Sequence, residues 1–357
     1  MSTLPNYPFK EPPPGGDSIE VAPGVRWLRM PLPFALDHIN LWLLADGDGW
    51  TIVDTGFASD AVKTCWETLL ARLAQEAALP EPKIKRIIVT HFHPDHFGLA
   101  SWLQEKTKAP IYMTQGEYLT AHAVWHEIGG HSTEHTVNQF QQHGLDQARC
   151  AALAERRGAY RRGAPNLPNS YCRLFDRDEL TIGQHQWQVR AGFGHSPEHA
   201  ALYCAELGVL ISGDMLLPKI STNISVFAAT PRANSLADYL DSLDDYRELP
   251  DTTFVLPSHG LPFYGMTARI DAQHAHHAER LDVLEACCTT PHSAADLLPS
   301  LFNNRTLDTH QTFFAMGEAI AHLNYLEHLG RLKIVPRQEQ HPGSAPSEAA
   351  PICYQKP

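Results

Sequence analysis

The sequence predicts an α/β protein in which two β-sheets pack together and helices cover their outer faces. Two observations support this prediction. Strand-like segments occur in two batches, within residues 25–113 and within residues 180–257, and helical segments lie between and outside them. The chain has 357 residues, of which 43% are hydrophobic and 19% are charged, so it can bury a sizeable core without disulfide bonds.

Apolar runs and the turns between them define the first batch of strands. Residues 39–45 and 50–54 are apolar and flank Asp-Gly-Asp-Gly at 46–49, which predicts a β-hairpin. Ser59 is a suitable N-cap for an amphipathic helix over 59–77. The other elements predicted in this batch are strands at 25–30, 86–90 and 110–113 and a helix at 97–107.

The second batch contains short strands and one amphipathic helix. Leu236, Leu240, Leu243 and Leu249 lie on or near one face of a helix over 235–249. The predicted strands span residues 180–182, 186–191, 200–204, 208–212 and 253–257.

The chain divides into four predicted regions. Residues 1–17 are rich in Pro and Gly and form an extended arm, and residues 18–266 form the main domain. Within that domain, residues 116–170 are polar and helical, so we interpret them as a helical insertion that could form a lid. Three helices and a short strand over 267–337 resemble a small winged-helix unit. Residues 338–357 are rich in Pro, Ser and Ala and are expected to be disordered.

The net charge narrows the range of binding partners. The chain has 28 Lys and Arg against 40 Asp and Glu, a formal charge of −12. An acidic protein is poorly suited to a broad nucleic-acid footprint or to an anionic membrane surface. The first 17 residues do not have the pattern of a signal peptide, and no stretch approaches 18 apolar residues. We therefore expect a cytoplasmic protein that acts on a small-molecule substrate.

The cysteines do not indicate a disulfide framework. There are seven of them, an odd number at irregular spacings, and no CxxC occurs. They are expected to be mostly buried, reduced residues.

A short motif after the strand at 86–90 indicates metal binding. His91, His93, Asp95 and His96 fall within six residues. Burying four such side chains without partners costs several kcal/mol, whereas a divalent cation satisfies them together. The spacing of His91 and His93 suits two imidazoles that converge on one ion, and Asp95 and His96 then face a second ion.

Three further ligand-type residues follow predicted strands. His195 lies in a Gly-rich turn, Asp214 ends an apolar strand, and His259 follows the strand at 253–257. Taken alone, each would more often be a capping or hydrogen-bonded residue. Together with residues 91–96 they form a strong joint pattern.

These residues, in this order, resemble the metallo-β-lactamase superfamily, and Asp54-Thr55-Gly56 matches an early element of that family. The resemblance covers roughly residues 20–265 and implies a four-layer αββα sandwich with a two-metal site at one edge. By position it assigns His91, His93 and His195 to one ion, Asp95, His96 and His259 to the other, and Asp214 to both. It suggests that Asp54 orients a ligand histidine. His199 is interpreted as hydrogen-bonded support.

The two-metal site implies a hydrolytic mechanism. Two divalent ions that share a water lower its pKa and provide a hydroxide that attacks a carbonyl or phosphoryl centre. Asp95 is the expected catalytic residue, because it could both ligate a metal and orient that hydroxide. Zinc fits a His-rich site best, with iron or manganese as alternatives.

A thioester or lactone is the favoured substrate. Glyoxalase II, a thioesterase of this superfamily, has a similar ligand set, although its basic glutathione-binding run is not found here. Thiolates leave readily, which suits a site with no dedicated general acid. Candidate substrate contacts are Lys219, Asn223, Trp125, His126 and Tyr264.

Two other functions remain open. A metal-dependent ribonuclease or phosphodiesterase is suggested by the C-terminal unit, because similar units occur in relatives that cleave RNA. Residues 291–337 carry four basic and four acidic residues, which disfavours nucleic acid. A non-catalytic lactamase-fold binding protein is the third hypothesis. The C-terminal unit could instead pack on the main domain or on a second subunit of a homodimer.

Overall fold

The computed structural model describes residues 5–336 and 351–357. The chain folds into two compact units, and each unit is built from segments that are separate in the sequence. The first contains Met1–Trp125, Ala159–Thr222 and Ser242–Asp271, and the second contains His126–Gly158, Asn223–Asp241 and Ala272–Pro357.

A seven-stranded sheet forms one half of the first unit. In spatial order its strands are β1 (Ile19–Ala22), β2 (Val25–Pro31), β3 (His38–Asp46), β4 (Gly49–Val53), β5 (Ile84–Ile88), β6 (Ile111–Thr114) and β7 (Cys172–Leu174). Neighbours from β1 to β4 are antiparallel, and those from β4 to β7 are parallel. Asp46 pairs with Gly49 across the predicted hairpin, and Gly47 has a φ of 63°, which glycine adopts without steric cost. The strands β1 and β7 were not predicted.

The second sheet has five strands, all of which correspond to the predicted second batch. In spatial order they are β12 (Phe254–Pro257), β11 (Val209–Gly213), β10 (His199–Cys204), β9 (His185–Gly192) and β8 (Glu179–Ile182). Only β11 and β12 are parallel.

The two sheets pack face to face around an apolar core. Trp27 and Trp42 from the first sheet and Trp187, Leu202 and Ile211 from the second are each at most 1% exposed in this core. Burying such side chains removes a large apolar area from water and is the main stabilising contribution to folding.

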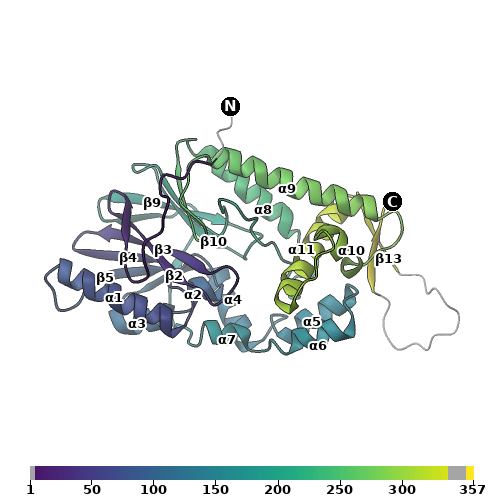
Figure 1. Cartoon of the computed structure of the whole chain (residues 1–357), viewed down its shortest axis with the longest axis horizontal. Helices are drawn as coiled ribbons and strands as arrows, with labels where there is room; N and C mark the ends of the chain where they lie inside the picture. The colour runs from purple at the N-terminus through teal and green to yellow at the C-terminus, as the bar shows by residue number, and fades with distance from the viewer. Residues whose placement is uncertain (1–4, 337–350) are drawn as a thin grey trace. The chain divides into compact units, whose positions relative to one another are not determined.

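Helices cover the outer faces of both sheets, as Figure 1 shows for α1 (Asp60–Glu76) and α3 (Ala100–Thr107) on the first sheet. On the second sheet, Arg190 of β9 donates a 2.8 Å hydrogen bond to the Asp245 carbonyl, at the end of α8 (Ser235–Asp245). The order helix, sheet, sheet, helix confirms the predicted αββα sandwich.

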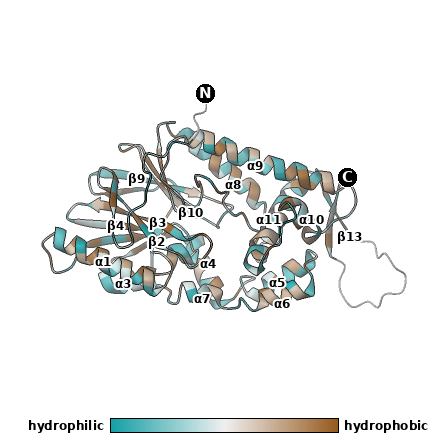
Figure 2. Cartoon of the chain, in the orientation of Figure 1, coloured by the Kyte–Doolittle hydropathy of each residue, from teal (hydrophilic) through white to brown (hydrophobic). Residues whose placement is uncertain are grey.

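Helix α1 illustrates how the sequence specifies these layers. Ser59 accepts a hydrogen bond from the Val62 N–H and caps the helix as predicted. Val62, Trp66 and Leu69 are buried on its sheet-facing side. The other face is polar, and α1 accordingly shows both hydrophilic and hydrophobic colours in Figure 2.

The second unit is mostly helical. It contains α5 (Thr133–Gln142), α6 (Gln147–Ala154), most of α9 (Met266–Cys287), α10 (Ala294–Leu301), α11 (Thr309–His328), and a two-stranded sheet of β13 (Lys333–Pro336) and β14 (Ile352–Gln355). No helix in the described residues is both long and apolar enough to cross a membrane.

The segments that form the second unit differ from the prediction, which placed a single domain boundary at residue 266. Residues 126–158, taken from the predicted insertion, belong to the unit that also contains α10 and α11. The Ala295 N–H donates to the His143 carbonyl at 3.1 Å, and the capping residue Ser293 lies against Gly144. These long-range contacts join segments about 150 residues apart, so a division at one point in the sequence could not represent them.

The prediction of a disordered C-terminal tail is corrected in part. Residues 338–350 lie outside the described residues, but 352–355 form the strand β14, which pairs with β13. Cys353 and Tyr354 are buried there, and the Tyr354 hydroxyl donates to Asn324 at 3.2 Å. Ile352 and Tyr354 are themselves strand-favouring residues, and the Pro-, Ser- and Ala-rich composition of the tail as a whole concealed this short segment.

Candidate metal centre

The predicted ligands lie in four loops at one edge of the sandwich. The loops follow β5, β9, β11 and β12. A 2.8 Å hydrogen bond from the Ala200 N–H to the Thr90 carbonyl joins the two sheets at this edge. In chain order the ligands are His91, His93, Asp95, His96, His195, Asp214 and His259.

Three imidazoles and one carboxylate form the first group, whose ligand atoms all lie within 4.8 Å of one another. His91 Nε2 lies 2.9 Å from His93 Nδ1 and 3.3 Å from His195 Nε2. The carboxylate is Asp214, whose Oδ2 lies 3.4 Å from His195 Nε2. Burial and the neighbouring imidazoles lower the pKa of His91 well below its usual value, and burial lowers that of His93 to about 3. Both rings are therefore neutral near pH 7 and have lone pairs available for a cation.

Asp95, His96 and His259 form the second group. Asp95 Oδ2 lies 3.6 Å from His96 Nε2 and 3.4 Å from His259 Nε2. Burial tends to lower the pKa of His96, but the carboxylates of Asp54, Asp95 and Asp214 keep it well above its usual value. The surrounding carboxylates thus create a strong attraction for positive charge at this position.

Asp214 lies between the two groups. Its Oδ2 faces the first group, and its Oδ1 lies 3.6 Å from His96 Nε2 and 3.5 Å from His259 Nε2. Burial tends to raise the pKa of Asp214, but the imidazoles of His259 and His96 hold it well below its usual value, so the side chain is a carboxylate.

Two atoms at this point show that the residues suit metal ions. Among the described residues, His96 Nε2 and Asp214 Oδ1 are buried and have no hydrogen-bond partner. Their 3.6 Å separation is too long for a direct hydrogen bond. Such buried polar atoms are costly unless a ligand satisfies them, and imidazole and carboxylate together suit zinc, iron or manganese.

Asp54 contacts His96, one of the candidate ligands. Its Oδ2 lies 2.8 Å from His96 Nδ1 and accepts from the Thr90 hydroxyl at 2.8 Å, and its Oδ1 accepts from the Thr90 N–H at 2.7 Å. The carboxylate thereby holds the Nδ1–H of His96, which leaves Nε2 directed at the other ligands. Asp54 has a φ of 62°, a conformation in which Asp is one of the more tolerated residues.

His259 is fixed in the same way by residues that the sequence analysis missed. Its Nδ1–H donates to the His38 carbonyl at 2.8 Å. The Asn40 amide donates to the carbonyls of Pro257 at 2.8 Å and Gly260 at 3.0 Å, which holds the loop on both sides of His259. A signal was present in the sequence, because Asn40 is a polar residue within an otherwise apolar strand.

His199 contacts the backbone of Asp214. Its Nε2 accepts a 3.2 Å hydrogen bond from the Asp214 N–H, and its ring centroid lies 5.0 Å from that of His91. A Cβ atom at Gly213 would lie only 2.2 Å from His199 Nε2, and Gly213 has a φ of 54°. Glycine is therefore required before Asp214 for this contact to form.

Glu117 in α4 (Gln115–His126) connects two ligand loops, and the sequence analysis did not identify it. Its Oε1 accepts from the Ser196 hydroxyl and the Glu198 N–H, both at 2.6 Å, and its Oε2 accepts from the Phe92 N–H at 2.9 Å. Burial raises the pKa of Glu117 to about 7, although these three hydrogen bonds oppose the shift. A single glutamate in a polar helix gives no sequence signal for this role.

Tyr160 in α7 (Ala159–Gly163) makes a further contact with the same region. Its hydroxyl donates to the Phe92 carbonyl at 2.6 Å. Together with Glu117 it fixes both backbone polar groups of the residue between His91 and His93.

The candidate substrate contacts belong to both units. Trp125 donates its indole N–H to the Ala164 carbonyl at 3.1 Å, and Lys219 is exposed with its Nζ 5.7 Å from the Tyr7 ring centroid. His126, which is exposed, and Asn223, which is partly buried, belong to the second unit.

Tyr264 does not join the metal ligands. Its ring stacks on Phe254, with centroids 4.6 Å apart. Phe254 begins β12, whereas His259 follows the end of that strand, so Tyr264 lies at the opposite end of β12 from the site.

Comparison with known families identifies the protein class. The sequence profile of the metallo-beta-lactamase superfamily matches residues 35–259, and the profile of a metallo-beta-lactamase-like C-terminal domain matches residues 281–341. The first match covers more than half of the chain and includes all seven candidate ligands. The chain therefore belongs to the metallo-beta-lactamase superfamily, as the resemblance indicated.

Similar proteins are known in several bacteria. A beta-lactamase domain protein from Burkholderia ambifaria is 44% identical, with 99% of this chain and 98% of that chain covered and a TM-score of 0.87. A metallo-beta-lactamase family protein from Thermus thermophilus is 29% identical, with 95% and 100% covered and a TM-score of 0.75. The probable metallo-hydrolase YqjP of Bacillus subtilis (strain 168) is 25% identical over 305 residues, with 84% of this chain and 91% of that protein covered. The family and the ligand cluster make this chain a metallo-hydrolase.

Proposed function

We propose that the protein uses two divalent ions, with zinc preferred, to hydrolyse a small ester-like substrate, either a thioester or a lactone. The observation that supports this most directly is the position of Asp214. Its two carboxylate oxygens face two separate groups of ligands, which suits one ion on each side. When bound, such a pair of ions supplies a hydroxide near neutral pH and polarises the electrophile.

The protein residues have separate tasks in this reaction. Asp95 lies between His96 and His259, where its carboxylate can accept a hydrogen bond from the attacking nucleophile and orient it. Asp54 and the His38 carbonyl keep two imidazoles in the orientation that presents Nε2. Glu117 and Tyr160 hold the loop that carries His91 and His93, and their polar atoms are already engaged by that loop.

The chemistry of the leaving group supports a thioester in particular. A thiol has a pKa of about 8.5, so a thiolate can leave without a proton donor, whereas an alkoxide from a simple ester cannot do so readily. A lactone also releases an alkoxide, so the strain of its ring must supply the activation that its leaving group lacks. The side chains that surround the reacting centre are metal-type ligands, and no dedicated proton donor stands out among the described residues.

An apolar surface beside the metal loop favours a substrate with an apolar acyl group. Phe34 is 46% exposed, and its ring packs against Phe57 with centroids 5.4 Å apart. A Cβ atom at Gly163 would meet both Phe57 and Pro94, and Pro94 lies between His93 and Asp95 in the chain. The two phenyl rings thus lie next to the loop that carries the ligands, where an acyl chain could contact them.

Matched substrates test this proposal. Zinc-loaded protein is assayed with a thioester and an alkyl ester of the same acyl group, a lactone, a β-lactam and a phosphodiester. We expect the thioester or the lactone to be hydrolysed, with the thioester far faster than the matched ester. Activity only on the phosphodiester would overturn the proposal in favour of the ribonuclease or phosphodiesterase alternative.

Variants connect the activity to the site. Asp214→Ala and His93→Ala should each abolish turnover, whereas Cys172→Ser in β7 should retain it. Full activity of a correctly folded Asp214→Ala protein would exclude the two-metal mechanism and leave the third hypothesis, a binding protein with a contaminating activity.

A further inference from the structure

A second group of potential metal ligands lies at the other end of the sandwich. His185, Cys204 and Glu206 each offer one ligand atom, and the three atoms lie within 4.8 Å of one another. His185 begins β9, whereas His195 lies beyond the end of that strand. A strand rises about 3.3 Å per residue, so β9 separates the two positions by about 23 Å. This group is therefore distinct from the catalytic centre.

Two hairpin turns bring the three residues together. His185 follows the turn between β8 and β9, and Cys204 and Glu206 flank the start of the turn between β10 and β11. His185 Nδ1 and Glu206 Oε2 are 2.7 Å apart and share a proton. A cation could replace that proton and be bound by both side chains.

Cys204 ends β10, and its side chain is fully buried at the edge of the core between the two sheets. Gly208, with a φ of 62°, allows the tight turn between β10 and β11 that follows it. Burial raises the pKa of the Cys204 thiol, so the free residue is protonated, and coordination would release that proton to solvent.

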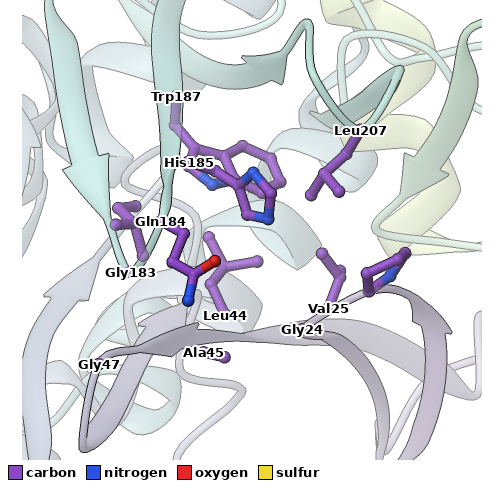
Figure 3. Close-up of a pocket in the computed structure, with 12 residues that line it drawn as sticks. Gly24, Val25, Leu44, Ala45, Gly47, Gly183, Gln184, His185, Trp187 and Leu207 are labelled. Atoms are coloured by element: carbon purple, nitrogen blue, oxygen red, sulfur yellow. The ribbon is translucent and has the colours of Figure 1, made fainter.

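His185 also lines a cavity of about 250 Å³, and Figure 3 shows its ring with Trp187, Val25 and Leu207 around the opening. On the His185 side of the group, this space could admit a cation and a water molecule as a fourth ligand. The turns of the two sheets form its walls. An ordinary ion pair between His185 and Glu206 would require neither the buried thiol nor this space.

We propose that His185, Cys204 and Glu206 form a binding site for a thiophilic divalent cation, for which Zn²⁺ is the best match. Zinc accepts thiolate, imidazole and carboxylate ligands together and commonly has three protein ligands and one water. Ligand atoms around tetrahedral zinc are about 3.5 Å apart, so closure requires a movement of about 1 Å. The exposed side chain of Glu206 can make that movement.

Cobalt substitution tests this site without interference from the catalytic centre. All seven ligands of that centre are His or Asp, so a thiolate-to-Co²⁺ charge-transfer band in the near ultraviolet can arise only from a cysteine site. We expect metal-free full-length protein titrated with Co²⁺ to develop this band. Cys204→Ser and His185→Ala should abolish it, and Glu206→Gln should weaken it. Cys172→Ser, a change in a half-buried cysteine elsewhere in the first unit, should leave it unchanged.

His185 and Glu206 are partly exposed, so their variants can be tested even if Cys204→Ser fails to fold. His185→Ala should bind one zinc ion fewer per chain than the wild type by elemental analysis, with hydrolysis unchanged. Absence of the band in the wild type would overturn the proposal, as would an undiminished band in His185→Ala. If the wild-type protein shows the band but hydrolyses none of the ester-like substrates, the result counts against the proposed function and leaves this metal site standing.

Discussion

Removal of the Glu117 carboxylate should loosen two ligand loops at once. Glu117→Ala deprives the buried Phe92 N–H and the partly buried Glu198 N–H of their acceptor, and Ser196 loses its partner. A buried donor without a partner costs about 1–3 kcal/mol, and a partly exposed one costs less because water can reach it. The free energy of unfolding should therefore fall by about 2–4 kcal/mol, measured by urea denaturation of the metal-free protein.

Glu117→Gln separates the hydrogen bonds from the charge. If its carbonyl oxygen takes the place of Oε1, it keeps the contacts with Ser196 and Glu198, but its amide then faces the Phe92 N–H as a second donor. The free energy of unfolding of Glu117→Gln should fall by about 1–3 kcal/mol, which lies between the decreases expected for Glu117→Ala and for the exposed control Glu105→Ala.

The same variants should weaken metal binding. Loss of residues that support metal ligands typically lowers metal affinity about 10–100-fold, and we expect Glu117→Ala to fall in that range in competition with a chelating dye. The reasoning is refuted if the free energies of unfolding of Glu117→Ala and Glu105→Ala differ by less than about 0.5 kcal/mol and the two variants bind zinc equally well.

Three further predictions concern other contacts. Asp54→Asn should lower metal affinity about 10–100-fold by chelator competition, because the amide can present a donor to His96 Nδ1; unchanged affinity would contradict the positioning role. Burial lowers the pKa of His277 to about 2 and of His322 to about 4. Their stabilising contribution is complete above pH 6.5 and is lost as the pH falls towards 4, so the free energy of unfolding in urea should fall over that range. His322→Gln should reduce this fall by about 3 kcal/mol, and identical pH profiles of the variant and the wild type would contradict the reasoning. Tyr354→Ala should cost about 3 kcal/mol in thermal or urea unfolding if β14 is part of the folded unit, and a cost near zero would contradict that assignment.

Local patterns in the sequence predicted the layers of the fold. The hairpin at 46–49, the cap at Ser59 and the apolar strands each depend on neighbouring residues, and the sequence contains them directly. The composition of the second unit depends instead on contacts such as that between Ala295 and His143, which no local pattern encodes. The strand β14 was missed because its burial comes from distant partners such as Asn324.

The same distinction applies to the metal centre. The seven candidate ligands, which the structure brings together, could be selected from the sequence because ligand-type residues after several apolar strands form a recognisable set. The residues that support them are ordinary in sequence. Glu117, Asn40 and Tyr160 gain their roles only when the fold places a buried carboxylate, amide or hydroxyl beside a particular backbone group.

The most direct test of the account is an anomalous difference map from crystals of the zinc-loaded protein. Two strong peaks are expected at the edge of the sandwich, one among His91, His93 and His195 and one among Asp95, His96 and His259, with Asp214 in contact with both. A single peak, or peaks only away from these residues, would contradict the two-metal centre.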